Sequence, residues 1–310
     1  MTVGGKVMAK KSNKPDYVKI STFLFIDEYE SRIGEVRGVI FNKFMTLLNY
    51  DLKNTKNIDI KPPHCWYRWG DEVVKYYIKS YTKWDHEDLG ITTVSWRGST
   101  PDFSLDDPTV IEIRKYIRKH IEEYSDIDGW ERAIDTLYGK APYPFQNEYR
   151  KLRENLKGAT TRSVYIQDYH SNVLIPLFDN AMKTFPNAFS EIKKEKSDFE
   201  SVFRVASETG TSVGELREMI EEFWFFFCYY LRVDKKCHEN ISSETLEVWR
   251  SSIPWEKELY VRSLQDHAYD MQLQGKEKRI DILLAEREER VKEFNDLLEE
   301  FRETDQRAEM

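Results

Sequence analysis

Residues 223–231 read Phe-Trp-Phe-Phe-Phe-Cys-Tyr-Tyr-Leu, a run in which every side chain is apolar or aromatic. Ser212 and Glu215 precede this run with the spacing of a capping box, in which each side chain binds a backbone N–H at the start of a helix. The pattern predicts a helix over 212–232. Because its second half is apolar on all sides, this helix needs neighbours all round, and we expect it at the centre of a helical bundle.

Charged side chains close to the run argue against a membrane span: Arg217, Glu218, Glu221 and Glu222. A helix that crosses a bilayer needs about twenty consecutive, predominantly apolar residues. We therefore expect a core helix and no membrane partner.

The composition bounds the class of protein. With 310 residues, 40% apolar and 14% aromatic, the chain has enough apolar material for two domains with real cores. Its net charge of −8 argues against a protein that is basic throughout and coats nucleic acid without selectivity. Three cysteines, an odd number, and the lack of a secretory apolar segment favour a reducing compartment, so we expect a cytoplasmic protein.

We expect a mainly α protein with two domains. Residues 1–15 read as a flexible basic tail, because they contain four lysines and little apolar surface. Residues 16–139 are predicted to form a small α+β domain, for which a winged-helix-like layout is one arrangement, and residues 140–310 a helical bundle. The boundary rests on the turn-rich segment Gly139–Pro144, with Gly158–Thr161 as the alternative.

The first domain is predicted to contain, in chain order, helices over 17–30 and 35–53, a strand over 64–69 ending at Gly70, a helix that Asp71 caps and that runs to Tyr81, a strand over 91–96, and helices over 108–124 and 130–138. In the second helix apolar residues recur at three- and four-residue steps, which leaves Lys43 and Asn49 largely outside the apolar face. Asp107-Pro108 marks a helix start, since Asp caps and Pro fits the first turn.

The second domain is predicted to contain helices over 163–184, 189–208, 212–232, 242–274 and 276–302, with interruptions at Pro176 and near Pro254. The last helix has apolar residues at alternating four- and three-residue steps, the pattern of a coiled coil: Ile280, Leu284, Val291, Phe294, Leu298 and Phe301. Packing within the chain and pairing with a second subunit both agree with this seam. The C-terminal helices are thus expected to bind a protein partner or a second copy.

One short stretch is the densest candidate for a binding surface. It comprises His64, Trp66, Tyr67, Arg68, Trp69, Gly70 and Asp71, to which we add Lys43. Trp, Tyr and Arg dominate the energetic centres of protein interfaces. The same rings would equally well fill a core, so both interpretations stay open.

Metal binding is disfavoured by the spacing of the available ligands. His64-Cys65 and Cys237-His238 offer zinc-binding side chains. Adjacent residues of a strand point to opposite faces, however, so both members of a pair seldom reach one tetrahedral ion. Gly210–Gly214 lacks the lysine of a phosphate-binding loop. We therefore expect neither a metal nor a cofactor.

A catalytic alternative comes from one helical motif. The segment from Arg262 to His267 resembles HEPN nucleases, in which four to six residues separate Arg from His on one helix. That resemblance implies metal-independent RNA cleavage with His as general acid–base and Arg beside the phosphate. Arg114 and His120 fit the spacing as well, and about one chance match is expected in such a chain. We therefore expect a non-enzymatic protein and keep RNA cleavage as the alternative.

Nucleic-acid contact is a third hypothesis. Its candidate residues are Arg97, expected at the tip of the wing, and four residues of the 108–124 helix: Arg114, Lys115, Arg118 and Lys119. Basic side chains on one helix face can neutralise phosphates of a duplex. The acidic residues Glu112, Glu122 and Glu123 allow the competing interpretation of an ordinary solvated face.

Two stretches of the first domain carry a family resemblance. They read Arg37-Gly38-Val39-Ile40-Phe41-Asn42-Lys43-Phe44-Met45-Thr46-Leu47-Leu48-Asn49-Tyr50 and Tyr67-Arg68-Trp69-Gly70-Asp71-Glu72-Val73. Their order resembles the Panacea (SocA-like) antitoxin domain over residues 17–82, about a quarter of the chain. Lys43 would match the motif lysine and Gly70 the motif glycine, whereas Asn42 replaces a glutamine and Asp71 the usual proline. The resemblance implies a helix-rich adaptor, found beside toxins, regulators or phage-defence components, that binds a protein partner and has no catalytic centre.

Overall fold

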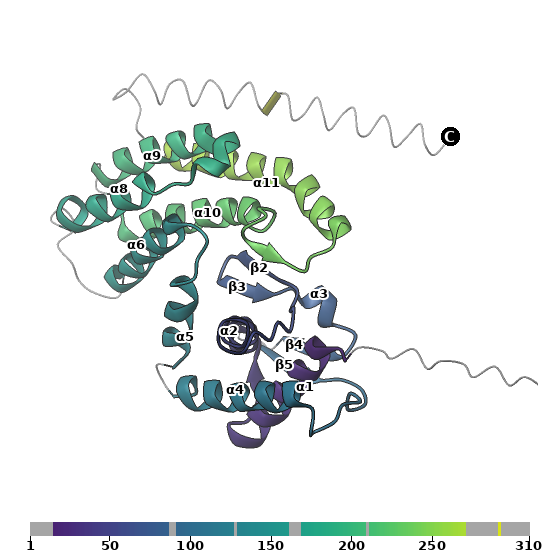
Figure 1. The fold of residues 1–310 in the computed structure, drawn as a ribbon. Helices are drawn as coiled ribbons and strands as arrows, with labels where there is room; N and C mark the ends of the chain where they lie inside the picture. Colours follow the sequence, from purple (N-terminus) through teal and green to yellow (C-terminus); the bar gives the residue numbers. More distant parts are fainter. Residues whose placement is uncertain are drawn as a thin grey trace, which may run out of the picture. The chain divides into compact units, whose positions relative to one another are not determined.

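The computed structural model describes residues 15–86, 91–126, 129–160, 169–208, 211–270 and 291–292. The chain divides into two compact units, whose elements Figure 1 labels. The first unit runs to Lys140 and includes His238–Ile241, and the second is formed by Ala141–Cys237 and by the chain from Ser242. Helices predominate in both, and the strands of the described residues form two small sheets. The prediction of a mainly α protein with a small α+β region is confirmed.

The first unit is built around helix α2 (Gly38–Lys56), which Figure 1 shows end-on. Helices α1 (Tyr17–Arg32), α4 (Pro108–Tyr124) and α5 (Gly129–Tyr138) surround it. Their apolar faces share one core, because side chains at three- and four-residue steps lie on the same side of each helix; this core includes Phe25, Phe41, Phe44, Leu48 and Ile117. Helix α4 begins as predicted, with the Asp107 carboxylate accepting from the Thr109 N–H at 2.8 Å.

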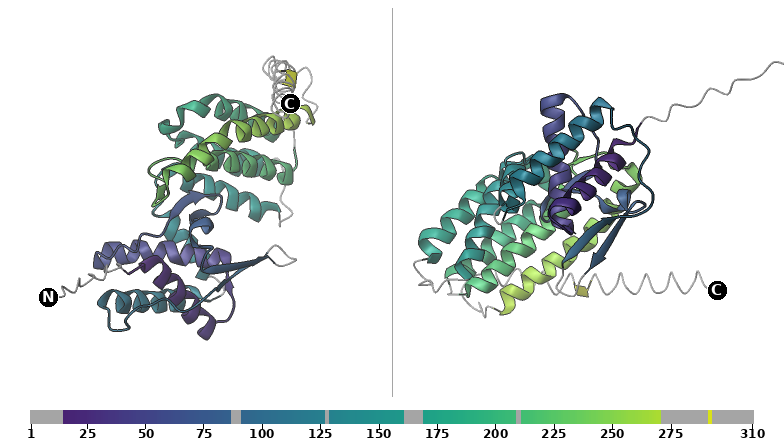
Figure 2. Two further views of the ribbon diagram at one scale, coloured as in Figure 1. Left: turned by 90° about the vertical axis from the view of Figure 1, so that its right-hand side faces the viewer. Right: turned by 90° about the horizontal axis from the view of Figure 1, so that it is seen from below.

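A three-stranded antiparallel sheet covers one end of this core in the order β1-β5-β4. Its strands are β1 (Val36–Arg37), β4 (Thr82–His86) and β5 (Thr92–Trp96), and the last two run side by side as a hairpin (Figure 2). Pairing of Val36 with Val94 takes β1 out of the predicted helix, which therefore begins at Gly38. A Cβ at Gly38 would lie 2.9 Å from the Trp84 ring, so a larger residue there would displace that ring.

The second sheet differs from the prediction of a strand followed directly by a helix that Asp71 caps. Strand β2 (His64–Tyr67) pairs with β3 (Gly70–Val73) and with β6 (His238–Glu239), giving the order β3-β2-β6. Asp71 does not cap a helix; it lies inside β3 opposite Trp66, and only one helical turn follows, α3 (Lys75–Ile78). Gly70, at φ +95°, permits the tight turn that joins the two strands. Because β6 pairs with β2, His238–Ile241 joins the first unit although it lies within the predicted 140–310 domain.

The second unit consists of helices that lie side by side (Figures 1 and 2). In chain order they are α6 (Pro144–Thr160), a π-helical turn (His170–Leu174), α8 (Ile175–Lys183), a 3-10 helix (Asn187–Ile192), α9 (Lys193–Glu208), α10 (Val213–Leu231) and α11 (Ser243–Asp270). Among the described residues none of these helices, nor any of the first unit, is long and apolar enough to cross a membrane.

Helix α10 is the central helix that the aromatic run predicts. The capping box is present, with the Glu215 N–H donating to the Ser212 hydroxyl at 3.2 Å and the Ser212 N–H donating to the Glu215 carboxylate at 3.1 Å. Rings of three neighbouring helices pack on it. Phe223 stacks on Phe199 of α9 at 4.3 Å, Phe226 stacks on Tyr260 of α11 at 4.4 Å, and Phe227 contacts Phe145 of α6 at 4.9 Å between centroids.

Helix α11 continues through Pro254, so the predicted break there is wrong. Proline removes one backbone N–H and leaves the carbonyl four residues earlier without its usual partner. Pro254 is exposed, and water can satisfy that carbonyl. The predicted basic tail and the predicted coiled-coil seam over 276–302 lie outside the described residues, apart from Pro15, Val291 and Lys292.

Candidate functional site

The predicted surface around residues 64–71 is largely interior. Trp66 is buried and its ring meets that of Tyr138 at 5.3 Å, and His64 and Asp71 are buried too. Tyr67 and Arg68 are half-buried, and Trp69 at the turn is 56% exposed. Most of the stretch therefore holds the fold together.

Lys43 lies under the turn of this hairpin and not outside the apolar face as predicted. The side chain is buried, and its ammonium donates to the backbone carbonyls of Trp69 and of Asp71, the latter at 3.1 Å. A buried ammonium is costly unless it is hydrogen-bonded. Asn49 is buried for a similar reason, because its side-chain oxygen accepts from the Ile60 N–H at 3.1 Å.

A charge network with a buried centre joins the three strands of the second sheet. The His64 Nδ1–H donates to Asp71 Oδ1 at 2.7 Å, Tyr50 donates to Asp71 Oδ2 at 3.0 Å, and Glu239 lies 3.9 Å from His64 Nε2. Burial lowers the pKa of His64, but the charge of Asp71 and its hydrogen bond outweigh burial and raise this pKa to about 10. The nearby imidazolium of His64 and the ammonium of Lys53 lower the pKa of Glu239 to about 2. This network ties β6 to β2 by an ion pair.

Metal ligation finds no support in the geometry of the described residues. Among the described residues no group of three or more His, Cys, Asp or Glu side chains is arranged so that it could hold a metal ion. Cys65 and Cys237 are both buried, and Cys65 faces His238 across the sheet.

The basic face of α4 is partly neutralised by α1. Glu28, which is almost fully buried, accepts from Arg114 at 2.6 Å and from Arg118 at 2.8 Å. Burial raises the pKa of Glu28, but the hydrogen bonds of Arg118 and Arg114 outweigh it and lower this pKa to about 2. These two arginines thus hold α4 against α1.

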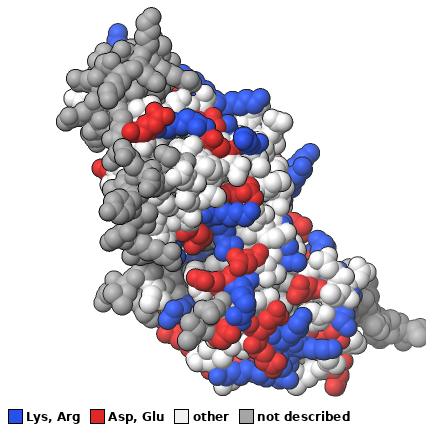
Figure 3. Space-filling view, turned by 90° about the vertical axis from the view of Figure 1, so that its left-hand side faces the viewer, with Lys and Arg blue, Asp and Glu red and all other residues white. Residues whose placement is uncertain are grey.

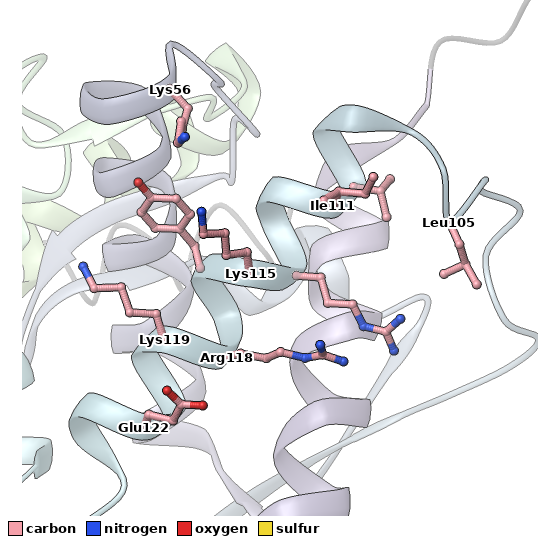
Figure 4. Close-up of a pocket in the computed structure, with 10 residues that line it drawn as sticks. Lys56, Leu105, Ile111, Lys115, Arg118, Lys119 and Glu122 are labelled. Atoms are coloured by element: carbon pink, nitrogen blue, oxygen red, sulfur yellow. The ribbon is translucent and has the colours of Figure 1, made fainter.

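Lys115 and Lys119 extend from the same helix into solvent (Figure 4). They line a recess of about 590 Å³ together with Lys56 and the apolar side chains Leu105 and Ile111. Within the described part of the chain neither lysine forms an ion pair. On the face drawn in Figure 3 basic and acidic side chains are interspersed.

Arg97 does not lie at the tip of a wing. Its backbone N–H donates to the Tyr81 carbonyl at 2.9 Å. Arg97 therefore directly follows the end of β5 and lies opposite Tyr81, the residue that precedes β4. The turn of that hairpin is at the opposite end of the strands, since His86 pairs with Thr92. The prediction that Arg97 lies at the tip of a wing is therefore wrong.

The two matches to the HEPN spacing have different surroundings. His267 donates to Glu222 of α10 at 2.9 Å, and Ser263 donates to the same oxygen at 2.7 Å. Arg262 forms an ion pair with Glu258 of its own helix at 3.6 Å. In the other match His120 is buried and donates to Asp51 at 2.9 Å, whereas Arg114 faces Glu28. In both matches the arginine and the histidine therefore contact different carboxylates.

A groove in the first unit was not predicted. It has a volume of about 700 Å³. We call it the α1–α5 groove, and its lining consists of Tyr29, Ile33, Glu35, Arg37, Val39, Ile40, Ile91, Thr92, Tyr124, Ser125, Asp126 and Trp130. Three of these apolar side chains are unusually exposed: Ile33 at 48%, Val39 at 46% and Trp130 at 41%.

Local structure explains why these side chains stay in solvent. Ile33 caps the end of α1, where its N–H donates to the Tyr29 carbonyl at 2.8 Å, and Gly34 at φ +118° then turns the chain toward β1. Val39 lies in the first turn of α2 and Trp130 in the first turn of α5. The one sequence signal was a large apolar residue beside a glycine at each helix end. It is too common to identify a site by itself.

Comparisons of the chain with protein-family models, with curated proteins and with solved structures found no match. The resemblance to the Panacea domain therefore rests only on the residues quoted for it.

Proposed function

We propose that the protein is a non-enzymatic adaptor whose α1–α5 groove binds an apolar segment of a protein partner. One observation carries this proposal. Ile33, Val39 and Trp130 come from three different segments, all three line one groove, and each has more than two fifths of its surface exposed. Single exposed apolar residues are ordinary on protein surfaces, whereas a contiguous apolar area marks an interaction site.

The lining indicates what kind of segment would fit. Tyr29 and Tyr124 are buried and form aromatic walls, and Trp130 offers a large ring of the type that dominates interface hot spots. Among the charged lining residues Glu35 and Asp126 are acidic and Arg37 is basic. We therefore infer a partner segment with one or two bulky apolar anchors next to a basic residue.

The groove is also held in shape before any partner binds. Its walls are the ends of helices and a paired strand, since Val36 and Arg37 form the ladder with Val94 and Thr93. Elements fixed in this way lose little further conformational freedom on binding, which favours affinity.

The family resemblance agrees with this proposal. Ile33, Glu35, Arg37, Val39 and Ile40 all lie within residues 17–82, where the chain resembles the Panacea domain. That resemblance implies an adaptor for a protein partner. A partner from a toxin–antitoxin or phage-defence system is the biological context that we propose with it.

Selection of peptides from a random display library on the purified full chain tests the groove. We expect enriched peptides with bulky apolar anchors whose binding is lost in Val39→Asp. An acidic residue suits the first turn of α2, because the helix dipole favours it there, so the helix itself should persist. Leu259→Asp, at a similarly exposed position of α11, is the control and should retain binding. Peptides that bind Val39→Asp as well as the wild type would refute this site.

Nucleic-acid contact through α4 is the second candidate. The observation that favours it is the pair Lys115 and Lys119, which carry no ion pair in the described chain, with Lys119 lying 5.7 Å from the centre of the Tyr116 ring. A gel shift with duplex DNA should weaken with salt and weaken further in Lys115→Gln plus Lys119→Gln. Arg114 and Arg118 are unsuitable for this test because they hold Glu28. A wild type that shifts no DNA at low salt removes this candidate.

A further inference from the structure

Strand β4 forms one edge of the first sheet. The sheet has the order β1-β5-β4, so among the described residues β4 has a neighbouring strand on one side only. Its hairpin with β5 extends past the helices of the first unit (Figure 2). An edge strand presents a row of backbone N–H and C=O groups to which another strand can bind. The outer edge of β4 is therefore a candidate contact surface.

The pairing with β5 fixes which backbone groups point outward. In an antiparallel ladder, opposed residues alternate between pairs that exchange hydrogen bonds and pairs that do not. Tyr81 accepts from the N–H of Arg97 at 2.9 Å, so the pair just before β4 is hydrogen-bonded. The next pair is therefore not hydrogen-bonded, and the alternation continues along the strand. The N–H and C=O groups that point outward are those of Thr82, Trp84 and His86.

The charges on β4 are complementary to a second copy of the same strand. Lys83 and Asp85 are exposed and lie on one face of the strand, where they form an ion pair with each other at 2.8 Å. When two β4 strands run antiparallel about an axis at Trp84, Lys83 of each copy lies opposite Asp85 of the other. These two residues then form a pair without backbone hydrogen bonds, in which the side chains are closest.

Backbone and charges together select this register. A slip by one residue would set the outward groups of one strand opposite residues whose groups point toward β5. A slip by two residues would set Lys83 opposite Lys83 or Asp85 opposite Asp85, and like charges directly opposite each other destabilise a sheet. Charges on edge strands commonly prevent pairing. Here they oppose the neighbouring registers and favour one.

We propose that β4 binds β4 of a second copy of this chain, which joins the two sheets into one across a two-fold axis at Trp84. A two-fold contact uses the same patch on both copies, and this strand is complementary to itself. A pair of five-residue strands buries much less than the roughly 1,200 Å² of a stable dimer, so the dimer is weak and forms at high concentration. The contact goes beyond the α1–α5 groove, because Arg37 of that groove lies in β1, at the opposite edge of the sheet.

Charge reversal tests the contact by sedimentation equilibrium of the full chain. The mass of the wild type should rise from 37.0 kDa toward twice that value with concentration. Lys83→Asp alone and Asp85→Lys alone each set like charges opposite each other twice, and should raise the dissociation constant about tenfold or more. An equimolar mixture of the two variants restores both opposite-charge pairs and should associate as the wild type does. Each variant loses its own Lys83–Asp85 ion pair in the mixture too, so recovery reports the contact between copies.

The backbone contribution is tested at His86. His86→Pro removes an outward N–H and keeps the ladder with β5, since proline is tolerated where the N–H faces solvent. It should weaken association, whereas His86→Gln, the matched control, should not. A wild type that stays monomeric up to its solubility limit, or a mixture of the charge variants that associates no better than either one alone, overturns the proposal.

Cross-linking tests the register independently of affinity. A mixture of Lys83→Cys and Asp85→Cys should form an intermolecular disulfide with diamide as oxidant, because residues 83 and 85 of the two copies lie opposite each other. Each variant alone should cross-link less. The native cysteines Cys65, Cys228 and Cys237 are buried and should not react. Cross-linking of either variant alone that exceeds cross-linking of the mixture would contradict the register.

Discussion

His64 shows how one buried side chain can carry charge in the fold. Its pKa is about 10 in the folded chain against an ordinary value of 6.5, because Asp71 stabilises the imidazolium more than burial disfavours it. A group whose pKa rises on folding stabilises the protein below the unfolded pKa. That contribution is therefore fully present below pH 6.5 and is lost as the pH rises through 10.

The prediction that follows concerns His64→Gln. Removing one partner of a buried ion pair costs about 3 kcal/mol of the free energy of unfolding. We expect this loss in urea unfolding below pH 6.5, and a progressively smaller difference from the wild type as the pH approaches 10. His86→Gln, at an exposed position, is the control. A destabilisation by His64→Gln that does not change with pH would show that the imidazolium is not the stabilising form.

Side-chain chemistry alone did not predict the positions of those candidate binding residues whose surroundings come from distant parts of the chain. Lys43 is polar and was expected outside the apolar face, yet the turn at Trp69 supplies carbonyls that satisfy its ammonium in the interior. Trp66 was equally compatible with a surface and a core. Only the contact with Tyr138, more than seventy positions away, decides for the core.

At the scale of elements, helix starts are the feature that local sequence predicts best. The capping box of α10 and the Asp107 cap of α4 need only residues two to three positions apart. Strands β4 and β3 were missed because their stability comes from pairing. Thr82–His86 is mostly polar and is a strand because it pairs with β5. Asp71 is a residue type that also begins helices, and only the folded structure shows that it lies in a strand and accepts a hydrogen bond from His64 of the neighbouring strand.

The cap of α10 gives a prediction at this scale. Ser212→Ala removes the acceptor for the Glu215 N–H and should lower the free energy of unfolding by about 1 kcal/mol. Ser251→Ala, an exposed serine within α11, is the control and should change it little. Urea unfolding measures both. An unchanged stability in Ser212→Ala would mean that the start of α10 does not limit the stability of the second unit.

For the whole molecule, the mainly α class follows from composition and periodicity, whereas the α1–α5 groove does not. Its exposed walls come from the end of α1, the start of α2 and the start of α5, so residues 33, 39 and 130 meet only in the folded unit. No spacing of residues along the sequence predicts that these three side chains lie close together.

The α1–α5 groove can be tested with one pair of exposed tryptophans. Trp130 lines the groove and Trp255 lies on α11 in the second unit, and their exposures are similar, 41% and 51%. Trp130→Ala should weaken peptide binding. Trp255→Ala should leave peptide binding unchanged.

The most direct test of the adaptor function is the dissociation constant of one selected peptide, measured by fluorescence anisotropy with wild type, Trp130→Ala and Trp255→Ala. Truncating a central aromatic anchor costs about 2 kcal/mol or more, so Trp130→Ala should weaken the peptide about thirtyfold. Trp255→Ala should match the wild type. Equal affinities for Trp130→Ala and the wild type would contradict a partner site in the α1–α5 groove.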